Sequence, residues 1–239
     1  MTAVPGTSWA VGVVVPAQNE ETSIGPCIES IRRSCESAHL GDYWIAIVAD
    51  SCEDDTVPRA RCAVDGVGEV LECTARSAGS ARRLGVDAVL THFGGRDLER
   101  VWLANTDADS VVPRDWLTVQ LRLADAGVAA VAGIVKLEEG GSSAAHELYR
   151  ATYLTRPDGT HGHVHGANLA LRADAYRDAG GWAHRPLAED HCLWNRLKRR
   201  GWRLASPVSS VVVTSARLIG RARGGFADTM RARIDASLA

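Results

Sequence analysis

Two carboxylates at the end of an apolar segment are the residues whose chemistry stands out in this sequence. The apolar residues 101–105 precede Asp107 and Asp109, which lie two positions apart. In an extended chain this spacing points both side chains to one side. At the end of a buried strand, where open α/β sheets bind ligands, the pair would suit Mg²⁺ or Mn²⁺, which would share the phosphates of a substrate. A structural alternative stays open, in which Asp109 caps the helix that begins near Pro113 and Asp107 is solvated.

A second acidic pair, Glu189 and Asp190, opens a segment of helical spacing that Gly201 terminates. A carboxylate at this place could act as a general base, which takes a proton from an attacking hydroxyl group. The helix macrodipole also favours acidic residues in a first turn whatever their function. The residue types alone therefore leave both explanations open.

Short apolar segments alternate with segments of helical spacing, which is typical of βα units. Strands are predicted at residues 9–15, 43–49, 69–73, 101–105 and 128–135. Helices are predicted at residues 24–38, 77–92, 116–126 and 189–200, and another ends near residue 64. This order predicts an α/β protein with a doubly wound, mainly parallel sheet in a three-layer α/β/α sandwich. Its polar segments would gather at the carboxyl ends of the strands.

The composition fits one large globular domain, with 239 residues, 46% hydrophobic and 23% charged. The 27 basic and 29 acidic residues give a net charge of -2, which lacks the basic surplus that nucleic-acid binding needs. No apolar segment reaches the roughly 18 residues of a membrane span, and the N-terminus lacks the pattern of a signal peptide. We expect a cytoplasmic protein with no transmembrane segment and no nucleic-acid partner.

The six cysteines form no Cys-x-x-Cys pair, which argues against a zinc knuckle or a redox motif. We expect free thiols.

Four segments in this order resemble the family 2 glycosyltransferases of the GT-A fold. They are VVVPAQNEE at 13–21, VADSCEDDT at 48–56, TDAD at 106–109 and LAED at 187–190. The resemblance covers about residues 11 to 215 and implies a single GT-A domain over residues 1–239. It further implies a nucleotide-sugar-binding half (1–136), an acceptor and catalytic half (137–215) and a C-terminal basic arm (216–239).

The resemblance implies transfer of a sugar from a nucleoside-diphosphate sugar, with a UDP-sugar favoured, to an acceptor hydroxyl. Asp50 would then accept the N3–H of uracil, and Arg76 would reach the base or the diphosphate. The base and ribose would be lined by Pro16, Ala17 and Glu20. The alternatives are a turn or capping role for the aspartate and a solvated arginine.

By the same resemblance, Asp109 would hold Mn²⁺ or Mg²⁺, with Asp107 on the metal or the ribose. The cation would act where negative charge develops on the β-phosphate. Asp190 would be the general base, with Glu189 beside it. A single displacement inverts the anomeric configuration, although the family also has retaining members.

Three histidines at positions 161, 163 and 165 would share one face of an extended chain. A zinc site is disfavoured because no fourth ligand is evident. We expect instead an acceptor-binding wall, formed by His163, His165, Gly166, Asn168 and Trp182.

A basic, glycine-rich segment follows an apolar strand at 208–213 and contains Arg217, Arg221 and Arg223. We expect a flexible lid over the diphosphate. A solvated arm, or weak contact with anionic lipid, is the alternative.

The sequence disfavours three other classes of protein. A sugar nucleotidyltransferase would carry a glycine-rich, basic loop after the first strand, and an oxidoreductase would carry Gly-x-Gly-x-x-Gly there; residues 16–20 have neither. A non-catalytic nucleotide-sugar-binding protein is disfavoured because Asp107, Asp109 and Asp190 are all present. The sugar and the acceptor have no recognisable code in the sequence.

Overall fold

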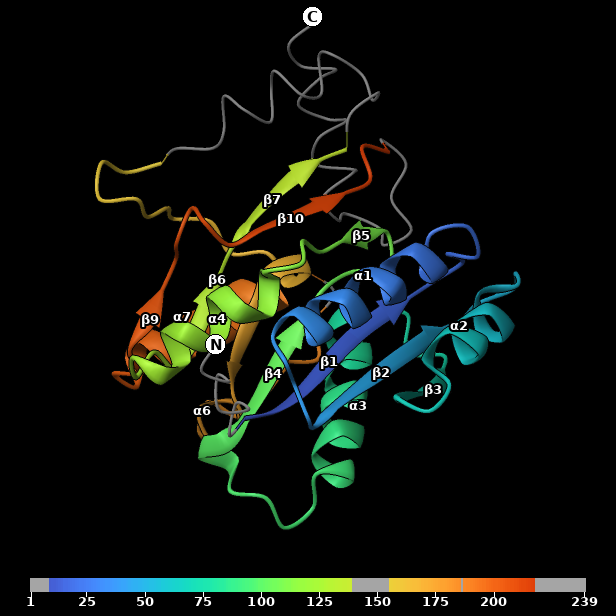
Figure 1. The fold of residues 1–239 in the computed structure, drawn as a ribbon, viewed down its shortest axis with the longest axis horizontal. Coiled ribbons are helices and arrows are strands. Elements are labelled where there is room, and N and C mark those ends of the chain that lie inside the picture. Colours follow the sequence, from blue (N-terminus) through green and yellow to red (C-terminus); the bar gives the residue numbers. More distant parts are fainter. Residues whose placement is uncertain (1–8, 139–154, 186, 218–239) are drawn as a thin grey trace, which may run out of the picture.

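The computed structural model describes residues 9–138, 155–185 and 187–217. Seven strands form a central sheet in the order β3-β2-β1-β4-β8-β6-β9 (Figure 1). The strands are β1 (Ala10–Ala17), β2 (Tyr43–Asp50), β3 (Gly68–Cys73), β4 (Val101–Asn105), β6 (Ala130–Ala132), β8 (Leu169–Arg172) and β9 (Leu204–Ala205). All neighbouring strands run parallel except β8, which is antiparallel to β4 and β6. The predicted α/β fold with a mainly parallel sheet is confirmed.

A second sheet has three strands in the order β5-β10-β7 and lies beyond the carboxyl end of β4 (Figure 1). Its strands are β5 (Ser110–Val111), β7 (Ile134–Leu137) and β10 (Val211–Thr214). The prediction of a single strand at 128–135 is wrong, because Gly133 divides this segment between β6 in the central sheet and β7 in the small sheet. A Cβ atom at Gly133 would lie 2.2 Å from Nδ2 of Asn168. Only glycine lets the asparagine approach here.

Helices cover both faces of the central sheet (Figure 1). They are α1 (Ile24–Ser37), α2 (Thr56–Val64), α3 (Ala78–His92), α4 (Trp116–Asp125), α6 (Ala173–Asp178) and α7 (Glu189–Arg199), with 3-10 turns η1 (Leu98–Arg100) and η2 (Gly166–Asn168). One hydrophobic cluster contains residues of α1, α2 and α4, and the other contains residues of α3, α6 and α7. The strand β1 contributes to both, because Val13 and Val14 point to opposite faces. The structure thus has the three layers that the alternating pattern predicted.

Close contact between α3 and the sheet depends on two glycines. A Cβ atom at Gly12 in β1 would lie 2.1 Å from Cγ1 of Val89, and one at Gly85 in α3 would lie 2.5 Å from Cγ1 of Val14. The absence of these side chains brings α3 close enough for its residues to reach the ends of the strands. This approach places Arg82 in the site described below.

All six cysteines are free, as expected. Among the described helices, none is both long and apolar enough to cross a membrane.

Candidate donor and catalytic site

The carboxyl ends of β1, β2 and β4 bring four predicted site residues to one edge of the sheet. These strands are parallel neighbours. Glu20 lies just beyond β1, Asp50 ends β2, and Asp107 and Asp109 follow β4. Sharp turns follow the first two strands, since Asn19 and Ser51 adopt positive φ angles of 53° and 58°. The polar segments therefore gather where the sequence predicted.

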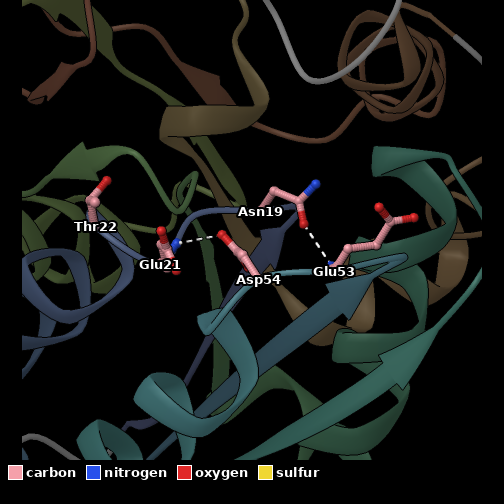
Figure 2. Close-up of a pocket in the computed structure, with 5 residues that line it drawn as sticks. All are labelled: Asn19, Glu21, Thr22, Glu53 and Asp54. Atoms are coloured by element: carbon pink, nitrogen blue, oxygen red, sulfur yellow. Dashed lines mark hydrogen bonds between the residues drawn. The ribbon is translucent and has the colours of Figure 1, made fainter.

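The loops after β1 and β2 are joined by side-chain hydrogen bonds (Figure 2). The Oδ2 atom of Asp54 accepts a bond of 3.1 Å from the Glu21 N–H, and Oδ1 of Asn19 accepts one of 2.8 Å from the Glu53 N–H. These residues and Thr22 line an open pocket of about 360 Å³. Three of the five lining residues are acidic, so the pocket disfavours a diphosphate.

The carboxylate of Asp109 is nearly buried, with 13% of its side chain exposed. The Thr214 hydroxyl donates to Oδ1 over 3.2 Å, and the Arg217 guanidinium lies 2.9 Å from Oδ2. Burial, followed by the charges of Asp107 and Glu20, raises the pKa of Asp109 to about 6, although Arg217 and Thr214 oppose this rise. Burial and the two neighbouring carboxylates therefore disfavour the ionised form of Asp109.

Arg217 reaches this site from the segment that follows β10. Its Nη1 and Nη2 atoms donate to the two carboxylate oxygens of Glu20 over 2.9 and 2.5 Å. The same Nη2 contacts Asp109. Arg217 thus lies at the predicted donor site, whereas Arg221 and Arg223 lie outside the described residues.

The hard oxygen ligands of this site fit Mn²⁺ or Mg²⁺ in chemical type. In the described part of the chain, no three His, Cys, Asp or Glu residues are arranged as a metal-binding group. Asp109 combines a nearly buried carboxylate with a raised pKa, so a cation there would favour its ionised form. One or two protein carboxylates suffice where a diphosphate supplies the other ligands.

Asp50 fixes the turn that leads into α3. Its Oδ1 and Oδ2 atoms accept hydrogen bonds of 2.9 Å each from the backbone N–H groups of Arg76 and Ser77. Arg76 has a φ angle of 48° and an exposed side chain. The capping alternative for Asp50 is therefore present in the structure. The Ser51 hydroxyl also donates to Oδ1 over 3.1 Å, whereas Oδ2 keeps a second lone pair, so this role is compatible with a contact between Oδ2 and a base.

The acidic pair at the start of α7 has two different sets of partners. The Oδ2 atom of Asp190 accepts a 3.0 Å bond from the Gly166 N–H, and its Oδ1 accepts a 2.7 Å bond from the His191 N–H. Glu189 instead accepts a 2.5 Å bond from the Arg82 guanidinium. The preceding Ala188 has a φ angle of 56°, which turns the chain sharply into the helix. The two adjacent carboxylates thus have different partners.

The buried arginine Arg82 was missed by the sequence analysis. Its side chain is 4% exposed and contacts Asp107 through Nη2 over 2.6 Å and Glu189 through Nη1 over 2.5 Å. A signal was present, because Arg82 shares the apolar face of its helix with Val86 and Val89 at helical spacing. An arginine on a core-facing stripe indicates a buried ionic partner.

Most of the predicted acceptor wall lies beside Asp190. The rings of His161, His163 and His165 are stacked, with 6.0 Å between the centroids of each neighbouring pair. The shared face predicted for these histidines is therefore seen in the structure. Burial lowers the pKa of His165 to about 4, with the nearby charge of Asp190 opposing this effect. The Gly166 N–H contacts the Asp190 carboxylate directly.

Asn168 and Trp182 have structural roles in place of the predicted surface roles. Both are buried. The Asn168 amide donates to the carbonyl oxygens of Ile134 and Ser210 and accepts from Nε1 of Trp116. The ring of Trp182 lies 5.3 Å from Cζ of Arg82. Asn168 joins the two sheets and Trp182 covers the buried arginine, so neither presents a surface to an acceptor.

Comparison with known proteins identifies related sequences and folds. Residues 8–223 match the protein family described as Glycosyltransferase like family 2. A search of curated proteins gave no match.

Several solved structures share the fold at low sequence identity. A mannosyltransferase from Pyrobaculum calidifontis, in complex with GDP-Man and Mn²⁺, is 21% identical, with a TM-score of 0.66; the match covers 92% of this chain and 60% of that protein. S. aureus TarS 1-349 with UDP-GlcNAc is 11% identical, with a TM-score of 0.67 and coverages of 96% and 66%. Glucosyl-3-phosphoglycerate synthase from Mycobacterium tuberculosis, with Mn²⁺, UDP-Glc and phosphoglyceric acid, is 19% identical, with a TM-score of 0.53 and coverages of 96% and 78%. The chain therefore spans about three fifths of the mannosyltransferase.

The variant Asp109→Asn is expected to be more stable than the parent at neutral pH. The pKa of Asp109 is 3.8 ordinarily and about 6 in the folded protein. At about 1.36 kcal/mol per unit, this difference costs up to about 3 kcal/mol once the group is ionised. The folded state binds the proton more tightly than the unfolded chain, so the parent loses this stability as pH rises from about 4 to 6.

Because asparagine cannot ionise, the variant's gain in the free energy of unfolding over the parent should disappear near pH 4. Urea unfolding of both proteins across this pH range provides the measurement. A gain that is the same at every pH would show that the charge of Asp109 is not its cause.

Proposed function

Because the chain belongs to the glycosyltransferase-like family 2, we propose that it transfers a hexosyl group from a nucleoside-diphosphate sugar to an acceptor hydroxyl, in a metal-dependent reaction with inversion. A UDP-sugar is the favoured donor. This proposal is supported by the buried guanidinium of Arg82, which contacts one residue of each acidic pair. The Arg82 nitrogens lie 2.6 Å from Asp107, beside the donor site, and 2.5 Å from Glu189, beside Asp190.

The donor would bind at the carboxyl ends of β1, β2 and β4. In this proposal Asp50 accepts the N3–H of uracil and Arg76 reaches the base or the diphosphate. The rest of the nucleotide-binding wall comprises Pro16, Ala17 and Glu20. The solved neighbours include complexes with UDP-sugars and with GDP-Man, so the choice of base needs a direct test.

Asp109 would hold Mn²⁺ or Mg²⁺, with Asp107 on the metal or the ribose. The cation would supply positive charge next to the β-phosphate, where negative charge develops as the sugar leaves. Two of the solved neighbours were crystallised with Mn²⁺ and a nucleotide sugar, which supports a divalent metal. The near-buried carboxylate of Asp109 supports the same assignment.

Asp190 would take the proton from the acceptor hydroxyl as its oxygen attacks the anomeric carbon. The backbone N–H groups of Gly166 and His191 hold this carboxylate in a fixed orientation, which is what a general base needs. His163 and His165 would lie along the acceptor. A single displacement of this kind inverts the anomeric centre.

Arg217 would close over the diphosphate once the donor is bound. In the structure its guanidinium is paired with Glu20 and Asp109. A divalent cation would compete with it for Asp109, and the diphosphate would provide a new partner for the released guanidinium. Arg221 belongs to the same proposed lid.

A donor panel provides the first test of this function. We expect release of nucleoside diphosphate from at least one of a set of UDP-, GDP- and dTDP-sugars, with UDP-sugars favoured and with dependence on Mn²⁺ or Mg²⁺. The measurement is made with and without each metal and with chelator as the control. Activity that resists the chelator would contradict the metal assignment, and the absence of release from every donor would contradict the transferase proposal.

The variant Asp190→Asn is expected to fold with a melting temperature close to that of the parent. Its side-chain oxygen still accepts the Gly166 N–H, while the basic lone pair is lost. Turnover at saturating donor should fall about 10²- to 10⁴-fold, and the affinity for UDP with Mn²⁺ should stay unchanged. Full turnover by the stable variant would move the base to Glu189 or His191.

The variant Arg217→Gln should bind Mn²⁺ alone more tightly than the parent, because the guanidinium no longer competes for Asp109. With Mn²⁺ saturating, its affinity for UDP should fall several-fold, about 1 kcal/mol for a partly buried charge contact. Calorimetric titration measures both constants, and Arg114→Gln, at an exposed arginine, is the control. Weaker Mn²⁺ binding without nucleotide would show that Arg217 does not compete with the metal.

A further inference from the structure

We propose that Arg82 is a positioning residue that holds one carboxylate of each acidic pair and thereby fixes where its neighbour, Asp109 or Asp190, lies. Arg82 binds one member of each pair, Asp107 and Glu189. In the proposed function, the other member, Asp109 or Asp190, holds the metal in one pair and takes the acceptor proton in the other. This inference rests on the proposed function.

The two contacts of Arg82 are short and involve separate nitrogens. Nη1 lies 2.5 Å from Oε1 of Glu189, and Nη2 lies 2.6 Å from Oδ1 of Asp107. Burial opposes the charge of the guanidinium, but the carboxylates of Asp107, Glu189 and Asp190 outweigh this effect and raise the pKa of Arg82. The guanidinium therefore stays charged and holds both partners by charge-assisted hydrogen bonds.

The surroundings of Arg82 leave its guanidinium little room to move. A Cβ atom at Gly166 would lie 2.5 Å from Cζ of Arg82, so only glycine is accommodated there. The ring of Trp182 packs against the guanidinium. A Cβ atom at Gly79 would lie 3.1 Å from Cβ of Glu189, which shows how closely α3 approaches the start of α7. The arginine is thus held in one orientation with both carboxylates in reach.

The partners of the remaining carboxylates differ from those of Asp107 and Glu189. Asp109 is contacted by the Thr214 hydroxyl and by Arg217, and Asp190 is contacted by two backbone N–H groups. Neither has an ion pair with Arg82 among the described contacts. In each pair, Arg82 therefore holds one carboxylate, and the other is held by different groups.

This arrangement also links the donor side of the site to the acceptor side. Arg82 lies on α3, Asp107 follows β4, and Glu189 begins α7. A shift of α7 away from the sheet would break the contact between Arg82 and Glu189. The distance between the bound donor and the base at Asp190 is therefore set through this arginine. A misplacement of about 1 Å can lower turnover about 10²-fold.

A charge-matched double variant separates positioning from stability. Arg82→Met alone would leave Asp107 and the nearly buried Glu189 carboxylate without their cation, so Glu189→Gln is added. The parent group of Asp107, Arg82 and Glu189 carries a net charge of −1, and the double variant keeps −1 on Asp107 alone. Replacing a buried ion pair by uncharged residues in this way is often close to neutral for stability.

For the double variant we expect a melting temperature near that of the parent, an affinity for UDP with Mn²⁺ within about threefold, and a kcat lowered about 10²-fold. Turnover is measured with the sugar nucleotide that the parent accepts in the donor panel. Arg83→Met is the matched control, because Arg83 lies next to Arg82 on α3 and is exposed; it should retain parental kcat and affinity.

Arg82→Lys provides the second test, since a lysine keeps the charge but cannot bind two carboxylates with separate, rigidly spaced nitrogens. Its kcat should also fall, by at least tenfold, with little change in the affinity for UDP. Parental kcat in Arg82→Lys, or in a stable double variant, would overturn the positioning role. Failure of the parent to release nucleotide from any donor would instead overturn the proposed function itself.

Discussion

The buried charge at one edge of the central sheet is the constraint on which this site depends. Four carboxylates there are paired with two arginines: Glu20 and Asp109 with Arg217, and Asp107 and Glu189 with Arg82. The balance is incomplete, since burial and the neighbouring acids raise the pKa of Asp109 to about 6. A site with such a deficit of positive charge reduces the stability of the fold and attracts a cation. On the proposed function, the stability lost at Asp109 would accompany its role as a metal ligand.

The fold satisfies this constraint by bringing distant segments very close together. The two arginines come from α3 and from the segment after β10, and the missing Cβ atoms at Gly12, Gly85 and Gly166 allow α3 and its arginine to lie this close to the sheet and to η2. Larger residues at these positions would move Arg82 away from its carboxylates. The close packing at these glycines therefore allows Arg82 to form its ion pairs with Asp107 and Glu189.

The parts of the fold that the sequence could predict are those with a local signal. The buried strands β1, β2 and β4 appear as apolar segments that end in polar residues, and the main helices have helical spacing with recognisable ends. The strand β8 was not predicted, because four residues carry too little periodicity and its place depends on pairing with β4 and β6. The division of residues 128–135 at Gly133 also depends on a distant contact, because the side chain of Asn168 packs against this glycine.

The site shows the same division between local and distant signals. Asp107, Asp109 and Asp190 were found through short motifs, whereas the partners of Arg82 lie 25 and 107 positions away along the chain. No periodicity connects residues at such separations.

On the proposed function, Arg217 would leave Glu20 and Asp109 for the diphosphate when the ligands bind. This change of partners implies that the metal and the donor would bind together. The guanidinium satisfies Asp109 and Glu20 in the structure, so a divalent cation alone must displace it without offering it a new partner. A diphosphate that arrives with the cation supplies that partner and adds negative charge to the site. The free energy lost when Arg217 leaves the carboxylates is then recovered at the phosphates. On the proposed function, each ligand would therefore increase the affinity of the site for the other, as thermodynamic linkage requires, and Arg217 would turn to the phosphates only when both are present.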